Sequence, residues 1–371
     1  MALAMDEKTF LSFYKNTMLG YSINQQKYIC NLLEEKHLIT FEEQANIFDS
    51  KEVIYFNSKG DIRSIIAQTT MNKDFINFYE WWEYTKLYKY SVPFFYDMES
   101  QDIIKGLEQS GIEKFEWDTP LQQKYVLNTS FRDITPTYYV YENKIFIKFV
   151  VQKTYMLQES LETIDYRYPV IIYIDLDNHF LEIRYDALKY SSAFDNNIYA
   201  RCVDDSIDWL KKMFQICLYE CDHANIIDII NSKQNEEVKI YKQMMEMSSG
   251  GSAELTASES RDYVLPFVGE IRELIDENSE LFDEAEEVKQ LLLQYLSDKE
   301  ATASYPYIYI KWIKPVESQS YIIKVTFDYF NNRYTLLQHI TGSCKDLGME
   351  RMNNAIEYLC KSGSFVKGEA V

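Results

Sequence analysis

The order of apolar and polar side chains predicts helices in the first third of the chain. Up to about residue 130, apolar residues recur at intervals of three and four, as at Ile29 and Leu33. This spacing puts side chains on one face of a helix. Ser22 stands three residues before Gln25, the pattern of a capping box that begins a helix. We therefore predict a mainly helical region over residues 1–132, with room for a winged-helix element.

Beyond about residue 135 the pattern changes to the strict alternation of a β-strand. Four apolar runs of this kind lie close together in the chain, at residues 138–141, 145–151, 170–176 and 180–185. Asn143 and Asn178 lie in the short turns between the members of each pair, which predicts two hairpins. The four runs are expected to form an antiparallel meander.

Helical spacing returns in the rest of this middle part. We expect one helix over 204–221, with Ile207 and Leu210 on its apolar side, and a second over about 223–247. Together with the meander they form a second region, residues 133–247.

The run Ser-Ser-Gly-Gly-Ser at 248–252 is typical of a linker or loop. After it, apolar residues again follow helical spacing, first over 264–275 and then through Leu281, Val288, Leu292 and Leu296. Three strands and a closing helix are expected next, at residues 307–312, 321–327, 334–339 and 350–360. These elements form a third region, residues 248–371.

The predicted fold class is therefore α+β. A helical N-terminal region precedes an antiparallel β-meander with helices. A pair of acidic helices, three antiparallel strands and a helix then complete the chain.

Composition excludes several classes of function. The 371 residues carry a net charge of −20, which argues against nucleic-acid binding over the whole surface, because phosphate neutralisation needs clustered Lys and Arg. The segment 81–90 mixes Trp, Tyr and Lys, a pattern that also suits base stacking, but such rings more often form a core. The 11 glycines form neither a dinucleotide-binding loop nor a P-loop. We expect no cofactor.

The acidic charge is concentrated in one place. Residues 254–300 hold 14 acidic and 4 basic side chains, which accounts for half of the net charge. Such a surface is either simply solvated or attracts a basic partner. The candidate partner-binding residues are Glu270, Glu273, Asp276, Glu277, Glu280, Asp283, Glu284, Glu286 and Glu287.

The second hairpin offers an alternative, catalytic interpretation. Asp175, Asp177, Glu182 and Arg184 lie on its two strands and its turn, and carboxylates in this arrangement suit Mg²⁺. The pattern faintly resembles the carboxylate hairpin of PD-(D/E)xK-type nucleases, but Arg184 replaces the lysine and cannot act as a base. That resemblance implies a Mg²⁺-dependent phosphodiesterase or nuclease. The competing interpretation is the solvent face of an amphipathic hairpin.

The cysteines are expected to be structural. Cys217 and Cys221 would lie one turn apart on the predicted helix, with His223 on another side, so no four ligands converge and no metal site is predicted.

The N-terminus lacks the apolar run of a secretory signal, and no 18-residue apolar stretch occurs, so a cytoplasmic chain with no membrane contact is expected.

The leading expectation is a non-enzymatic regulatory or assembly subunit that binds a basic protein partner through its acidic helices. The abundance of Lys, Ile, Asn and Tyr suggests an AT-rich bacterial or phage genome, and with it a role in a conflict or antiviral defence system. The oligomeric state is left open.

Overall fold

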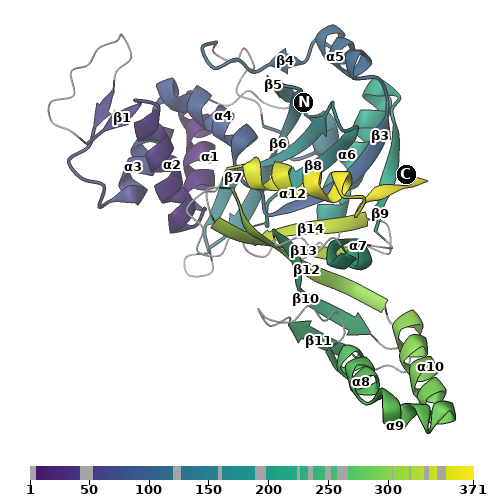
Figure 1. Cartoon of the computed structure of the whole chain (residues 1–371). Coiled ribbons are helices and arrows are strands. Elements are labelled where there is room, and N and C mark those ends of the chain that lie inside the picture. The colour runs from purple at the N-terminus through teal and green to yellow at the C-terminus, as the bar shows by residue number, and fades with distance from the viewer. Residues whose placement is uncertain are drawn as a thin grey trace. The chain divides into compact units, whose positions relative to one another are not determined.

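The computed structural model shows an α+β fold, as the sequence predicts (Figure 1). It describes residues 6–41, 53–119, 127–157, 161–188, 198–223, 226–232, 237–246, 252–256, 266–302, 304–316, 319–329, 334–340 and 348–371. The chain divides into two compact units. The first unit comprises residues 1–219, 343–353 and 370–371, and the second comprises residues 220–342 and 354–369. The three consecutive regions expected from the sequence stay a prediction.

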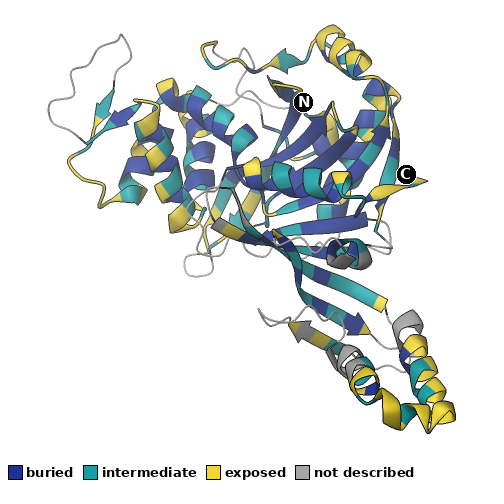
Figure 2. Ribbon diagram, in the orientation of Figure 1, coloured by how far each residue is buried: buried dark blue, intermediate teal, exposed yellow. Residues whose placement is uncertain are grey.

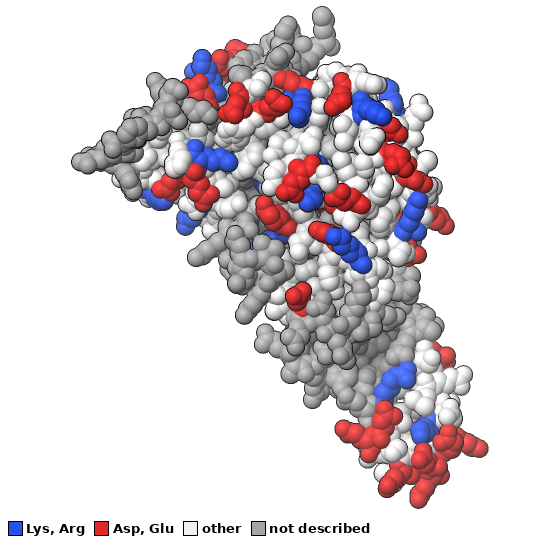
Figure 3. Space-filling model, turned by 45° about the horizontal axis from the view of Figure 1, so that its top comes forward, with Lys and Arg blue, Asp and Glu red and all other residues white. Residues whose placement is uncertain are grey.

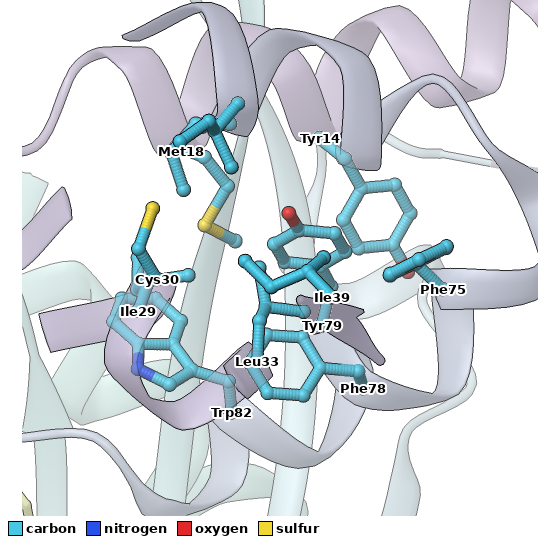
Figure 4. Close-up of a cluster of buried hydrophobic side chains, with 12 residues drawn as sticks. Tyr14, Met18, Ile29, Cys30, Leu33, Ile39, Phe75, Phe78, Tyr79 and Trp82 are labelled. Carbon is cyan, nitrogen blue, oxygen red and sulfur yellow. The ribbon is translucent and has the colours of Figure 1, made fainter. Parts of the chain in front are cut away.

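The first unit begins with a layer of helices: α1 (Glu7–Leu19), α2 (Ile23–Glu35), α3 (Ile62–Thr70), η1 (Lys73–Phe75) and α4 (Ile76–Thr85). The short parallel strands β1 (Ile39–Thr40) and β2 (Ile54–Tyr55) lie between α2 and α3 in the chain. The capping box predicted at Ser22 and Gln25 is present and begins α2. The inner sides of the helices meet in a buried cluster that includes Tyr14, Met18, Ile29, Leu33, Phe78, Tyr79 and Trp82 (Figure 4).

The sheet of the first unit contains the predicted meander. Its strand order is β3-β8-β7-β6-β5-β4. The bounds are β3 (Tyr90–Asp97), β4 (Glu113–Lys114), β5 (Thr137–Tyr141), β6 (Lys144–Met156), β7 (Thr163–Asp175) and β8 (Phe180–Tyr185). Strands β5 to β8 pair antiparallel in sequence order, and β4 pairs parallel to β5. The two predicted hairpins are therefore confirmed.

Helices cover both faces of this sheet. Three helical elements lie between or after its strands in the sequence. They are α5 (Ser100–Gln109), the short 3-10 helix η2 (Phe131–Asp133) and α6 (Ile198–Phe214). Phe149 of β6 packs against Trp209 of α6, whereas its neighbour Lys148 reaches Glu80 of α4. Because successive side chains of a strand point to opposite faces, α4 and α6 lie on opposite faces. All six residues of β8 are accordingly buried. In Figure 2 much of this sheet is dark blue, the colour of buried residues.

Four charged side chains are buried between the helical layer and the sheet. Arg167 of β7 donates to Glu80 at 2.7 Å and to Glu83 at 2.8 and 3.0 Å. Lys148 of β6 bonds the same two glutamates, and its Nζ lies 3.0 Å from Glu83 Oε2. None of the four residues is more than 4% exposed. Two acids and two bases therefore neutralise one another at the point where α4 crosses β6 and β7.

The second unit contains an antiparallel sheet of strand order β11-β10-β12-β13-β14. The bounds are β10 (Val238–Glu246), β11 (Ser252–Thr256), β12 (Ser304–Val316), β13 (Gln319–Asp328) and β14 (Tyr334–Ile340). Its helices are α7 (Ile226–Ser232), α8 (Pro266–Glu277), α9 (Ser279–Asp283) and α10 (Glu286–Thr302). The strands predicted at 307–312, 321–327 and 334–339 are confirmed.

Three elements lie across the division between the units: β9 (Cys217–Asp222), α12 (Glu350–Lys361) and β15 (Val366–Ala370). The helix predicted at 350–360 is thus confirmed as α12.

Two predicted helices in the middle of the chain are wrong in extent. The helix expected over 204–221 ends at Phe214, after which Gln215 has a φ of 55° and β9 begins at Cys217. Gln215 N still donates to Lys211 O at 2.8 Å, but its left-handed backbone turns the following residues away from the helical repeat. The second helix, expected over 223–247, is the short α7 followed by β10. Tertiary pairing with β12 overrides the helical spacing of this segment.

Removing one base from the buried charges should destabilise the first unit. Arg167→Met leaves Glu80 and Glu83 buried with Lys148 alone, so we expect a loss of about 3–5 kcal/mol in the free energy of unfolding. Arg132→Met is the matched control, because Arg132 also pairs with an acid, Asp205, but is 75% exposed. Its effect should stay below about 1 kcal/mol. Urea denaturation measures both, and equal losses would contradict the account.

The buried charges should also make the first unit sensitive to acid. Burial alone would raise the pKa of Glu80, but Lys148 and Arg167 outweigh it and hold that pKa at about 2. A carboxyl with a lowered pKa stabilises the fold above its unfolded pKa and loses this effect as the pH falls toward 2. The free energy of unfolding should therefore decline below about pH 4.5. Glu80→Gln should make this decline shallower in urea titrations, and an unchanged slope would show that Glu80 has no part in it.

Candidate interaction surface

The acidic segment forms three helices that pack through one side. Ile275 of α8 and Leu296 of α10 are buried with Met245 of β10. Ile271, Phe282 and Leu292 pack around them. This small core fixes α8, α9 and α10 against the sheet of the second unit and leaves their other sides to solvent (Figure 2).

Seven of the nine predicted partner-binding residues lie on the outward sides. Asp276, Glu277, Glu280, Asp283, Glu284, Glu286 and Glu287 are all exposed. Glu270 and Glu273 lie in α8, but their side chains fall outside the described residues. Figure 3 shows the red carboxylates gathered around the tip of these helices, with only a few blue side chains among them.

Few basic groups neutralise these carboxylates. Lys289 pairs with Asp283 at 2.8 Å, and Gln290 donates to Glu286 at 2.8 Å. Hydrogen bonding to Asp283 raises the pKa of Lys289. Within the described part of the chain, Asp276, Glu277, Glu280, Glu284 and Glu287 make no ion pair. The negative potential of these helices is therefore open to solvent.

Large apolar side chains lie exposed among the acids. They are Leu274 (55% exposed), Leu281 (68%), Val288 (51%), Leu291 (68%) and Tyr295 (54%). Val288, Leu291 and Tyr295 recur at three and four residues along α10 and so share one of its faces. Leu292 and Leu296 lie beside them on the same helix and belong to the small core. We call the seven exposed carboxylates together with these five side chains the acidic–apolar surface.

The sequence did not predict the apolar part of this surface. Leu281 and Val288 were expected to continue the apolar face of Leu292 and Leu296. Leu281 lies in α9, which ends at Asp283 before α10 begins at Glu286, so it does not share the helical repeat of Leu292 and Leu296. Val288 does share that repeat, but it lies in the first turn of α10 and is 51% exposed. The signal that would have revealed it is the width of the apolar stripe of α10, in which Val288, Leu291 and Tyr295 lie beside Leu292 and Leu296.

The carboxylates of the predicted catalytic hairpin do not face a common open position. Asp175 is buried at the end of β7 and accepts hydrogen bonds from the backbone of Asp177 and Asn178, each at 3.0 Å. It therefore stabilises the turn. Asp177 lies in that turn and accepts from Asn143 at 3.0 Å.

Glu182 and Arg184 are fully buried and bonded to each other. Arg184 Nε lies 3.0 Å from Glu182 Oε2, and its Nη2 lies 2.8 Å from Asn353 Oδ1. Ser91 donates to the other oxygen of Glu182 at 2.7 Å. The expectation of a solvent-facing hairpin is thus wrong, because both faces of β8 are covered. The same contacts occupy the groups that the magnesium hypothesis needs.

Other candidate groups also have structural surroundings. Cys217 and Cys221 lie in strand β9, not on a helix, and only Cys217 is exposed. His223 stacks on Phe327 with the ring centroids 4.1 Å apart. Among the described residues, no three His, Cys, Asp or Glu side chains converge as a metal site. Trp82, Tyr84 and Tyr88 of the aromatic segment 81–90 are buried in the first unit.

Comparison with known proteins adds no relative: no protein-family model matches the chain, and no curated protein matches it. Among the described helices, none combines the length and the apolar character that crossing a membrane requires. The geometry of the side chains is thus the basis for any functional conclusion.

The hairpin contacts predict different effects for two acidic residues. Glu182→Ala leaves Arg184 buried without its acid, so the melting temperature should fall by roughly 10 °C. Asp177→Ala removes one exposed hydrogen bond and should change it little. Differential scanning calorimetry measures both variants. A stable Glu182→Ala protein would show that this pair does not hold the hairpin.

Proposed function

We propose that this protein is a non-enzymatic binding subunit that captures a protein partner through the acidic–apolar surface. The observation that carries the proposal is the combination of unpaired carboxylates with large exposed apolar side chains on the same short helices. Exposing the large apolar side chains of Leu281 and Leu291 to water is unfavourable, so a surface that is only solvated gains nothing from them. Burying them against a partner would be favourable.

The chemistry of this surface defines the partner. The carboxylates attract a positively charged surface and orient it before contact, which raises the association rate at low salt. The apolar side chains of α10 then bury area against the partner and slow its release. The best-matched partner therefore presents a basic amphipathic helix, with apolar residues along one face and Lys or Arg at its margins.

The cellular setting belongs to the same proposal. A cytoplasmic regulatory or assembly subunit of a bacterial or phage conflict system fits the Lys-, Ile-, Asn- and Tyr-rich composition. The magnesium-dependent alternative stays a prediction from the sequence that the contacts of Asp175, Glu182 and Arg184 do not favour.

Neutralising the acids should weaken binding of a basic amphipathic peptide. The probe is a fluorescent peptide of about 20 residues with leucines at helical spacing and lysines elsewhere. In the variant Asp283→Asn/Glu284→Gln/Glu286→Gln/Glu287→Gln we expect at least about tenfold weaker binding at low salt and a flatter salt dependence. Fluorescence anisotropy over a salt series measures both quantities.

A matched control separates local from total charge. The variant Glu35→Gln/Asp74→Asn/Glu108→Gln/Glu142→Gln removes four exposed carboxylates of the first unit. It should bind the peptide as the unaltered protein does. Equal weakening in both variants would mean that only net charge matters. Wild-type affinity after Leu281→Ser/Leu291→Ser would refute the apolar part of the proposal.

A further inference from the structure

The sheet of the second unit carries lysine and tyrosine side chains on one face. The register places Lys242, Tyr309 and Lys324 side by side across β10, β12 and β13. Lys239 and Lys311 form the next row on the same face, and Tyr307 lies two residues from Tyr309. We call this set the lysine–tyrosine face: Lys239, Tyr241, Lys242, Tyr307, Tyr309, Lys311 and Lys324. All seven side chains are partly exposed.

The other face of the same sheet is a covered core. Ile308, Ile310, Ile323 and Val325 point to it and are fully buried. Trp312 stacks on Tyr321 and meets Tyr358 of α12, while Met245 packs against α8 and α10. Since side chains alternate along a strand, these helices lie on the face opposite the lysine–tyrosine face. The acidic–apolar surface is therefore not part of it.

The rings and the ammonium groups lie close together. Tyr307 and Tyr309 are 5.8 Å apart between ring centroids, with their planes at 83°. Lys324 Nζ lies 3.6 Å from the centroid of Tyr307, and Lys242 Nζ lies 5.6 Å from that of Tyr309. Lys311 approaches Tyr241 in the same way, at 5.6 Å. Lys242, Lys311 and Lys324 are thus each held over the sheet by an aromatic ring.

The charge on this face is unbalanced. Glu254 bonds Lys242 at 2.7 Å and accepts from Tyr307 at 3.1 Å. Within the described residues, Lys239, Lys311 and Lys324 have no acidic partner within ion-pair distance, although the whole chain carries −20. Lys239 and Lys311 are direct cross-strand neighbours, an arrangement in which like charges repel and destabilise the sheet. An anion between them would remove this repulsion.

We propose that the lysine–tyrosine face binds single-stranded nucleic acid. Phosphates of an extended strand meet the unpaired lysines, and bases stack on the tyrosine rings beside them, the combination that such strands require. Duplex binding would use the lysines alone, because paired bases cannot reach the rings. The inference is independent of the proposed capture of a protein partner, since it rests on the opposite face of the sheet.

The test uses the full chain and two fluorescein-labelled probes, oligo(dT) and oligo(U) of about 20 nucleotides. Anisotropy at low salt should show saturable binding of at least one of them. The variant Lys239→Gln/Lys311→Gln/Lys324→Gln should bind at least about tenfold more weakly, and its salt slope should be shallower by about 2, the value for three lost phosphate contacts on a single strand. It should fold normally, because it relieves a repulsion.

Two controls make the test specific. Lys59→Gln/Lys105→Gln/Lys361→Gln removes three lysines that are 54%, 62% and 59% exposed and lie outside this face, and it should bind as the unaltered protein does. Tyr309→Phe should keep the affinity, whereas Tyr309→Leu should lose about tenfold because stacking is lost.

Several outcomes would overturn the proposal. One is no saturable binding of either oligonucleotide at low salt. Another is an equal loss of affinity in the control lysine variant. If Tyr309→Leu binds normally and heparin competes as well as oligo(dT), the face is only a general polyanion site. If instead the lysine variant abolishes self-association measured by ultracentrifugation while no oligonucleotide binds, the occupant is a second copy of this chain.

Discussion

The first unit depends on the neutralisation of charges that water cannot reach. Glu80 and Glu83 from α4 meet Lys148 of β6 and Arg167 of β7, and each group would be costly to bury alone. The pairing fixes where α4 crosses the sheet. The same ion pairs occupy the four charged side chains, which would otherwise be the obvious candidates for catalysis. The first unit, in its described part, is best understood as a scaffold in which these four buried charges neutralise one another.

The second unit has the opposite character. Its sheet is covered on one face, where α8, α10 and α12 pack. Among its described residues, five carboxylates of α8 to α10 and three lysines of the sheet make no ion pair. The acidic–apolar surface and the lysine–tyrosine face differ in sign and lie on different sides of the sheet. At physiological salt, charges separated by more than about 8 Å are largely screened from each other. A strongly acidic protein can therefore carry a local basic site, and one unit can serve two ligands of opposite charge.

Local patterns predicted local structure well and distant contacts not at all. The capping box at Ser22, both hairpins and the three late strands follow from spacing alone. The prediction of a helix over 204–221 was wrong in extent because Gln215 adopts a left-handed backbone, which the spacing of apolar residues does not predict. Arg167 lies 87 residues from Glu80, so nothing in the sequence marks the pair. The polar side chains of the second hairpin were expected in solvent because the helices that cover β8 come from other parts of the chain.

The central claim is that the working surfaces of this protein lie on its second unit. Hydrogen–deuterium exchange of the full chain, with and without the basic amphipathic peptide, tests this most directly. The account predicts slower exchange confined to α8, α9 and α10, where binding would restrain the helices. Slower exchange around the hairpin of Asp175 and Glu182, with α8 to α10 unchanged, would contradict it.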